Sequence, residues 1–176
     1  RLNYMDTIEM AYSGAQIIHP KTIKPLQQKN IPLYVRPFGD KTAPGSVITG
    51  DVERAYEPIM IQKSNQVLLN LHSRDLSFVL EEKFAKVFTT FDSHRIRINL
   101  VHNSAVNLYM AVDASWHIDD AISELRAEGF DVDKMEDVEM VTIRYYNDAL
   151  YRRYAFDERI IIKQTTPHSL RFVRTK

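Results

Sequence analysis

The sequence predicts an α+β fold in which one ferredoxin-like unit is followed by a second, incomplete unit of the same kind. Three observations predict it. From residue 59 onward, apolar strands and amphipathic helices follow in the order strand, helix, strand, strand, helix, strand, which is the ferredoxin-like order. Two segments of this region resemble each other without a gap. The residues before it are punctuated by Gly and Pro, so a small α/β segment precedes the two units.

The opening segment predicts two short helices. Thr7 to Gly14 has apolar residues at helical spacing, with Asp6 as its N-cap and Gly14 as its stop. Pro20 suits the first turn of a second helix that ends at Lys29. The apolar stretches IPLYV and VIT that follow are strand candidates.

The region after the opening segment predicts the regular elements. The expected first unit has strands 59–61 and 66–71, helix 79–94, strands 96–101 and 106–112, helix 118–129 and strand 138–145. That last strand also opens the second unit, which continues with a helix 148–157 and a hairpin. The expected divisions are residues 1–50, a linker 51–58, a first unit 59–137 and an incomplete second unit 138–176.

The second unit is predicted from an internal repeat. INLVHNSAVNLYMAV, from Ile98, aligns with IIIKQTTPHSLRFVR, from Ile160, and Leu108 coincides with Leu170. The second copy ends without a second helix or a fourth strand, so we expect it to be incomplete. Any two β-hairpins look alike at this level, and the repeat alone does not decide the fold.

Composition excludes several classes of protein. The chain has 176 residues, of which 44% are hydrophobic and 26% charged, and its 23 basic residues balance 23 acidic ones. No global field therefore favours a nucleic acid or an anionic membrane. Cysteine is absent, which rules out disulfides and fits a reducing compartment. No apolar run approaches the roughly 20 residues that span a bilayer. We expect a cytoplasmic protein with no nucleic-acid or membrane partner.

Other motifs have structural explanations. The six histidines show no HxxxH or HExxH spacing, so no metal site is expected. His19 and Pro20 form a junction between two elements, which explains them better than catalysis does. Arg152 and Arg153 belong to a packed helix, because the chain has no basic stripe for nucleic acid.

The opening segment resembles the aspartate kinase family. In that family a segment of the form EMAxxGAKVLHPxTIxPxxxxxIPxxVxxxxxPxxPGTxI closes the catalytic domain, and here it stands as EMAYSGAQIIHPKTIKPLQQKNIPLYVRPFGDKTAPGSVIT. The remainder is similar to the family's regulatory tail of paired ACT domains, in which the ferredoxin-like unit recurs. The resemblance implies that residues 1–50 end a catalytic domain and that the chain is a C-terminal fragment of such an enzyme.

The resemblance also implies an activity for the parent enzyme. It would transfer the γ-phosphoryl group of ATP to the β-carboxylate of aspartate, with ATP and Mg²⁺ as cofactors. The family's lysine near the nucleotide phosphates is Gln16 here, which brings no point charge to a phosphate; Gln16 stays a weak candidate for ATP contact. The family's substrate- and phosphate-binding motifs are absent from these residues, so we expect the fragment to be inactive, without a catalytic residue or a cofactor of its own.

The resemblance places an effector site at turns of the first unit, where a free amino acid sits between two ACT units. Turns offer backbone and side-chain donors for a carboxylate and acceptors for an ammonium group. Asn99 stands where relatives receive the ligand's amino group, and its counterpart in the second copy is Ile161, so only the first copy is equipped. The candidate effector-binding residues are Asp75, Leu76, Ser77, Phe78, Asn99, His102, Asn103, Ser104 and Val106.

Lysine and threonine both stay open as effectors. A lysine ε-ammonium needs a carboxylate, which Asp75, Glu81 or Glu82 can provide, whereas Ala105 falls where some lysine-regulated relatives carry Glu. Threonine needs only hydroxyl partners. The resemblance implies feedback inhibition and a homodimer through the ACT domains. A stand-alone amino-acid sensor and a dimerisation module without a ligand are the alternatives.

Overall fold

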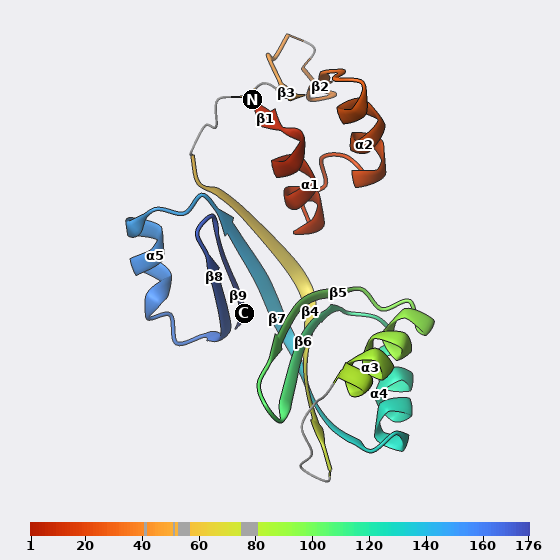
Figure 1. The fold of residues 1–176 in the computed structure, drawn as a ribbon. Helices are drawn as coiled ribbons and strands as arrows, with labels where there is room; N and C mark the ends of the chain where they lie inside the picture. Colours follow the sequence, from red (N-terminus) through yellow and green to blue (C-terminus); the bar gives the residue numbers. More distant parts are fainter. Residues whose placement is uncertain (41, 51, 53–56, 75–80) are drawn as a thin grey trace.

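A long curled sheet dominates the molecule, and an N-terminal helical part lies at one end of it (Figure 1). The computed structural model describes residues 1–40, 42–50, 52, 57–74 and 81–176. Helices cover the outer surface of the sheet in two places (Figure 1). Within the described residues, no helix is both long and apolar enough to cross a membrane.

The N-terminal part is a small α/β segment, as predicted. Its three-stranded sheet has the order β1-β3-β2, in which β1 runs parallel and β2 antiparallel to β3. Tyr4, Ile23 and Ile48 form its buried core. The elements are β1 (Leu2–Asn3), α1 (Tyr4–Tyr12), α2 (Pro20–Gln28), β2 (Leu33–Val35) and β3 (Ser46–Thr49).

The predicted start of α2 is confirmed, whereas the predicted N-cap of α1 is not. His19 caps α2, and its Nδ1 accepts a hydrogen bond from the backbone N–H of Lys21 at 3.2 Å, while Pro20 opens the helix. The prediction that Asp6 caps α1 is wrong. The cap is Asn3, whose Oδ1 accepts from the N–H of Asp6 at 2.7 Å, so the helix begins earlier and Asp6 lies in its first turn.

The main sheet has six strands in the order β5-β6-β4-β7-β9-β8, and neighbouring strands are antiparallel. Two of the strands, β4 and β7, are 15 residues long. The elements are β4 (Ile59–Ser73), α3 (Glu81–Ser93), β5 (Ile98–Asn103), β6 (Asn107–Asp113), α4 (Ile118–Ala127), β7 (Phe130–Arg144), α5 (Asp148–Ala155), β8 (Ile160–Thr166) and β9 (Ser169–Thr175).

The two long strands each serve two ferredoxin-like units. In the first unit, the second half of β4 pairs with β6 on one side and with the first half of β7 on the other. In the second unit, the first half of β4 pairs with the second half of β7, whose other side pairs with β9. The α+β, ferredoxin-like prediction is confirmed. In sequence order the second unit ends with the β8–β9 hairpin, as expected, and β4 supplies its fourth strand from an earlier part of the chain.

The units join where the long strands are irregular. The register of β4 against β7 shifts between Lys63 and Gln66. Asn65 on β4 and Asp137 on β7 both have φ of 55°, in the left-handed region that Asn and Asp tolerate better than most residues. These bulges turn the strands, and the sheet bends on itself. The expected break between strands 59–61 and 66–71 is therefore a bulge within one strand.

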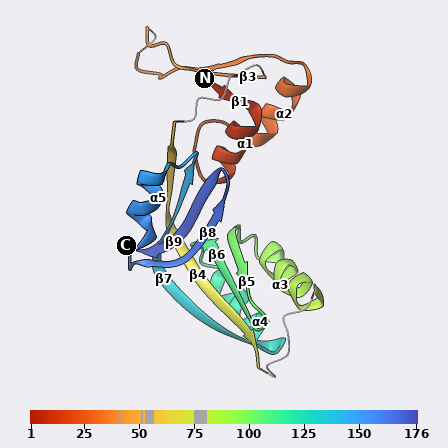
Figure 2. The same ribbon diagram turned by 60° about the vertical axis from the view of Figure 1, so that its left-hand side comes forward.

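The bend encloses an inner core between the two halves of the sheet. Leu68, Leu100 and Ala111 of the first unit pack there with Ile162 and Val173 of the second. The edge strands approach each other, since the Gln164 Nε2 of β8 donates to the carbonyl oxygen of Val101 in β5 at 2.7 Å. Figure 2 shows β8 lying beside β5 and β6. The sheet thus nearly closes on itself, with α3 and α4 packed outside one half and α5 outside the other.

Candidate functional site between helix α1 and the sheet

The predicted effector residues fall into three groups. Asp75, Leu76, Ser77 and Phe78 lie outside the described residues. His102, Asn103, Ser104 and Val106 come together at the tip of the β5–β6 hairpin, where the first three are exposed. Ser104 closes this turn, because its N–H donates to the Asn107 carbonyl at 2.9 Å and its Oγ accepts from the Asn107 N–H at 3.1 Å. Asn99 lies at the opposite end of β5.

Asn99 is buried, with 3% of its surface exposed, inside a polar network. Its Nδ2 donates to the Oε1 of Gln66 at 2.7 Å and to the Oδ1 of Asp113 at 2.8 Å. Its Oδ1 accepts from the Nζ of Lys63 at 2.9 Å, and the same ammonium lies 2.5 Å from Asp113. In this structure, Asn99 therefore accepts a hydrogen bond from the ammonium group of Lys63 of the same chain.

This network lowers the pKa of Asp113. Burial by itself raises the pKa of that carboxyl, but hydrogen bonds from Gln66, Lys63 and Asn99 outweigh it. Sequence analysis missed Lys63, Gln66 and Asp113 as partners of Asn99. The available signal was the presence of polar residues on otherwise apolar strands, since Gln66 and Asp113 lie directly opposite each other on β4 and β6.

Gln16, the candidate for ATP contact, is exposed on the N-terminal segment. It lines a hollow of about 530 Å³ together with His19 and Arg97. Arg97, which precedes β5, donates from its Nη2 to the carbonyl oxygen of Tyr12 at 2.9 Å. The hollow therefore spans the N-terminal segment and the first unit.

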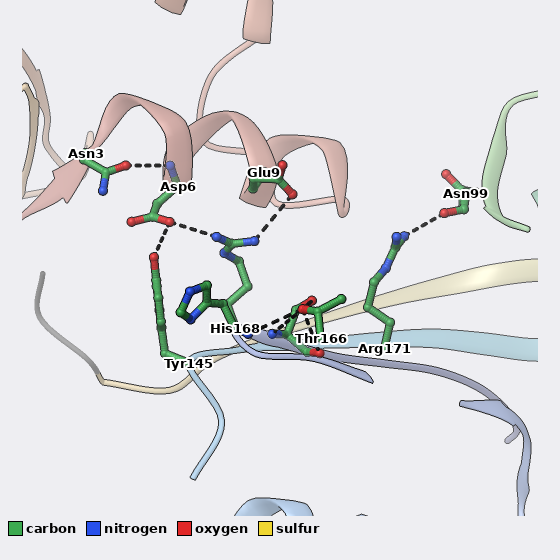
Figure 3. Close-up of polar contacts among 10 residues, drawn as sticks. Asn3, Asp6, Glu9, Asn99, Tyr145, Thr166, His168 and Arg171 are labelled. Atoms are coloured by element: carbon green, nitrogen blue, oxygen red, sulfur yellow. Dashed lines mark hydrogen bonds and ion pairs between the residues drawn. The ribbon is translucent and has the colours of Figure 1, made fainter. Parts of the chain in front are cut away.

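A second cavity, of about 470 Å³, lies between α1 and the end of the sheet formed by β7, β8 and β9, and sequence analysis did not predict it. Figure 3 shows Asp6 and Glu9 on α1 on one side, Thr166 and His168 of the sheet on the other, and Arg171 farther along the sheet and directed at Asn99. The cavity is lined by Asn3, Met5, Asp6, Glu9, Ser13, Thr142, Arg144, Tyr145, Gln164, Thr166, His168, Ser169 and Arg171.

One wall of this cavity is an ionic contact that holds α1 against β7. The Nη2 of Arg144 lies 2.8 Å from the Oδ1 of Asp6, and its Nη1 lies 3.4 Å from Glu9. Tyr145 donates its hydroxyl to Asp6. Burial raises the pKa of Tyr145, and the negative charge of Asp6 raises it further. The tyrosine thus stays a neutral hydrogen-bond donor to Asp6.

The other wall carries Arg171, a cation in a different environment. Its Nη2 donates to the carbonyl oxygen of Asn99 at 2.6 Å and contacts the sulfur of Met140 at 3.7 Å. Burial lowers the pKa of Arg171, because the charged guanidinium is partly removed from water. Hydroxyl groups form the floor, where Thr166 Oγ1 accepts from the N–H of Ser169 at 3.0 Å and lies 2.8 Å from its hydroxyl.

The fold defines a pair of ferredoxin-like units joined through a common sheet, the arrangement expected for paired ACT domains. No family model matches the sequence. Aspartokinase 3, chloroplastic, of Arabidopsis thaliana is 33% identical over 120 residues, which are 65% of this chain and 21% of that protein. Lysine-sensitive aspartokinase 3 of Escherichia coli (strain K12) is 30% identical over 115 residues, 64% of this chain and 25% of that protein.

Solved aspartokinase structures share the fold. E. coli aspartokinase III in complex with lysine and aspartate matches 99% of this chain and 42% of its own, with a TM-score of 0.79 and 22% identity. Clostridium acetobutylicum aspartate kinase matches 99% of this chain and 44% of its own, with a TM-score of 0.80 and 12% identity. The chain is therefore related to the aspartokinases, and its sequence and fold are consistent with a C-terminal aspartokinase fragment. It spans about a fifth to a quarter of the length of the curated relatives.

Proposed function

We propose that this chain is the regulatory part of an aspartate kinase and that it binds an end-product amino acid, lysine or threonine, for feedback inhibition. The parent enzyme phosphorylates the β-carboxylate of aspartate with ATP and Mg²⁺. The observation that carries the proposal is the pair of ferredoxin-like units built on common strands, with α1 docked on them. The segment that contains α1, residues 1–50, resembles the end of the family's catalytic domain and is called the kinase-like segment. A protein of the same fold, E. coli aspartokinase III, is described in complex with lysine.

The effector site of this proposal is the exposed tip of the β5–β6 hairpin together with residues 75–78. His102, Asn103 and Ser104 offer polar groups at an exposed turn, and the ring of Tyr109 lies 6.4 Å from that of His102. Asn99 has a supporting role, because its amide already bonds Lys63, Gln66 and Asp113. A homodimer through the ACT domains completes the site, since family pockets of this kind lie between two units.

Feedback inhibition follows if the effector binds one arrangement of the chain better than another. The Asp6–Arg144 contact gives the signal a direct route, because it joins β7 of the sheet to α1 of the kinase-like segment. In the parent enzyme, Gln16 would then lie near the ATP site. The fragment itself performs no phosphoryl transfer in this proposal and holds no cofactor.

The experiment is calorimetric titration of the chain with L-lysine and, separately, with L-threonine. We expect heat from one and not from the other. His102→Ala should weaken that binding at least about tenfold, the effect of losing one hydrogen bond to a charged ligand group. His94→Ala is the matched control, because His94 lies at the end of α3 and pairs with Glu124 instead. Equal affinity in both variants would place the effector elsewhere, and heat from neither amino acid would contradict the proposal.

A further inference from the structure

Arg171 differs from the other buried arginines of the sheet. Arg144 pairs with Asp6 at 2.8 Å, and Arg174 pairs with Glu139 at 2.7 Å. Arg171 has no carboxylate within 4.0 Å among the described residues, and its Nε has no hydrogen-bond partner there. Its one oxygen partner is the neutral carbonyl of Asn99. The charge is thus partly desolvated without being neutralised.

An arrangement of this kind is unfavourable unless an anion completes it. Removing an ionised group from water costs free energy that a carbonyl contact only partly offsets. The lowered pKa of Arg171, caused by burial, expresses the same cost. Thr142, on the neighbouring strand, lines the same cavity, and its Oγ1 is also buried without a partner. Both residues line one cavity, and a carboxylate accepts hydrogen bonds from guanidinium and hydroxyl groups alike.

The opposite side of the cavity offers a carboxylate to a positive group. Glu9 projects from α1, with 49% of its side chain exposed, and its ion pair with Arg144 is long at 3.4 Å. Glu9 and Arg171 both line the cavity, yet the two groups form no ion pair within 4.0 Å. Asp6 is not available to a ligand in the same way, because its carboxylate already accepts hydrogen bonds from Arg144 and Tyr145. The cavity is thus lined by a negative and a positive group that do not pair with each other.

We propose that this cavity is a second amino-acid site, in which Arg171 binds the α-carboxylate and Glu9 the α-ammonium group of a free amino acid. A zwitterion matches both walls, whereas a simple anion uses only one. The volume of about 470 Å³ leaves room for a side chain over the hydroxyl-lined floor. The site lies apart from the hairpin and does not depend on it. Because its ligand would contact both α1 and β9, binding strengthens the attachment of the kinase-like segment to the sheet.

The test follows binding by calorimetry and by the NMR signals of the arginine Nε–H groups. The probes are glycine, L-threonine, L-lysine and N-acetyl-L-threonine, which keeps the carboxylate but has no ammonium group. We expect the Arg171 Nε–H signal to shift with the amino acids. Arg171→Met should weaken amino-acid binding at least about tenfold, and Arg171→Lys less, because lysine keeps the charge without the planar fork.

Glu9→Gln tests the ammonium-binding group separately from the carboxylate-binding group. Because the Glu9 side chain is half exposed, this variant should fold and can test the proposal even if Arg171→Met does not fold. It should weaken L-threonine binding about tenfold and leave N-acetyl-L-threonine binding unchanged. His102→Ala, at the hairpin, should leave the Arg171 shift unchanged, so the failure of one site does not imply the failure of the other. An Arg171 signal that none of the probes moves at millimolar concentration, or unchanged L-threonine affinity in Glu9→Gln, would overturn the proposal.

Discussion

At the scale of single residues, the network of Lys63, Gln66, Asn99 and Asp113 shows how an ion pair is held within a sheet. Each member bonds at least one other, and the carboxylate accepts from the other three. Networks satisfied in this way stabilise a fold, whereas partly satisfied ones destabilise it. The network also fixes the base of the β5–β6 hairpin, whose tip carries the proposed effector residues.

The Asp113 carboxylate should make stability depend on pH. Its pKa is lower in the folded chain than in the unfolded one, so its contribution is complete above about pH 4 and is lost as the pH falls through the folded value. Asp113→Asn should lower the free energy of unfolding by about 1–2 kcal/mol at pH 7, a modest value because a third of the side chain is exposed. It should also flatten the decline below pH 4.

Urea unfolding at pH 7, 5 and 3 measures both effects. Asp92→Asn is the matched control, since Asp92 is an exposed residue of α3 outside the network. A variant with the same stability loss at pH 3 as at pH 7 would show that the Asp113 charge does not stabilise the fold.

Sequence analysis identified Asn99 but not its environment. The repeat alignment singled out a polar residue at a strand position that is apolar in the second copy. The partners could not be predicted, because Lys63 is 36 positions from Asn99 in the chain and reaches it only through the pairing of three strands. The Arg171 cavity was missed for a similar reason, since its two walls come from opposite ends of the sequence.

At the scale of elements, helix α1 is fixed by a contact outside itself. Asn3 and Asp6 are both good N-cap residues, and local propensity did not decide between them. Asp6 is buried, 7% exposed, because Arg144 and Tyr145 of the distant sheet bind its carboxylate. The cap therefore falls on Asn3, and the helix begins three residues earlier than the sequence predicts.

Asp6→Asn should weaken the docking of α1 on β7. Removing one charge from a buried ion pair leaves the Arg144 cation uncompensated, which costs about 3 kcal/mol. We expect hydrogen exchange of the α1 amides to accelerate and the free energy of unfolding to fall by about that amount. Asp119→Asn is the matched control, because the Asp119–Lys134 pair lies at the surface and contributes little. Equal exchange rates of α1 in wild type and Asp6→Asn would show that the ion pair does not hold the helix.

The long strands were harder to predict than the helices. The structure contains the helices predicted as α1, α2, α4 and α5. Helix α3 lies within the predicted range 79–94. In β4, the polar run Lys63-Ser64-Asn65 looks like a turn, but it is a bulge that the pairing with β7 keeps in the sheet. In β7, residues 133–137 lack an apolar alternation, because all five of their side chains are exposed.

At the scale of the whole molecule, the common strands make the two units one structure. Phe130 of β7 pairs with Ser73 at one end of β4, and Arg144 pairs with Ile59 at the other. The sequence indicated two units but not their joint construction, since the fourth strand of the second unit precedes the first unit in the chain. Cooperative unfolding of both units is the expected result.

Ile61→Asp tests this coupling. Ile61 is 7% exposed on the half of β4 that belongs to the second unit, and a buried unpaired charge there is strongly destabilising. We expect hydrogen-exchange protection to fall equally in β9 and in the distant helix α4. Met60→Asp, at a neighbouring position that is 48% exposed, should have little effect. Protection lost in β9 alone would mean that the units unfold independently.

The shared strands also determine the order in which parts of the sheet can form during synthesis. On the ribosome the chain emerges from its N-terminus at about 5–20 residues per second, so Ile59 leaves the exit tunnel long before its partner Arg144. Until then the leading half of β4 has an unsatisfied backbone, while the hairpin of β5 and β6 and its helices can already assemble on the trailing half. The nascent chain thus carries an open half-strand until β7 has been made, and strands made much later than β4 complete its sheet.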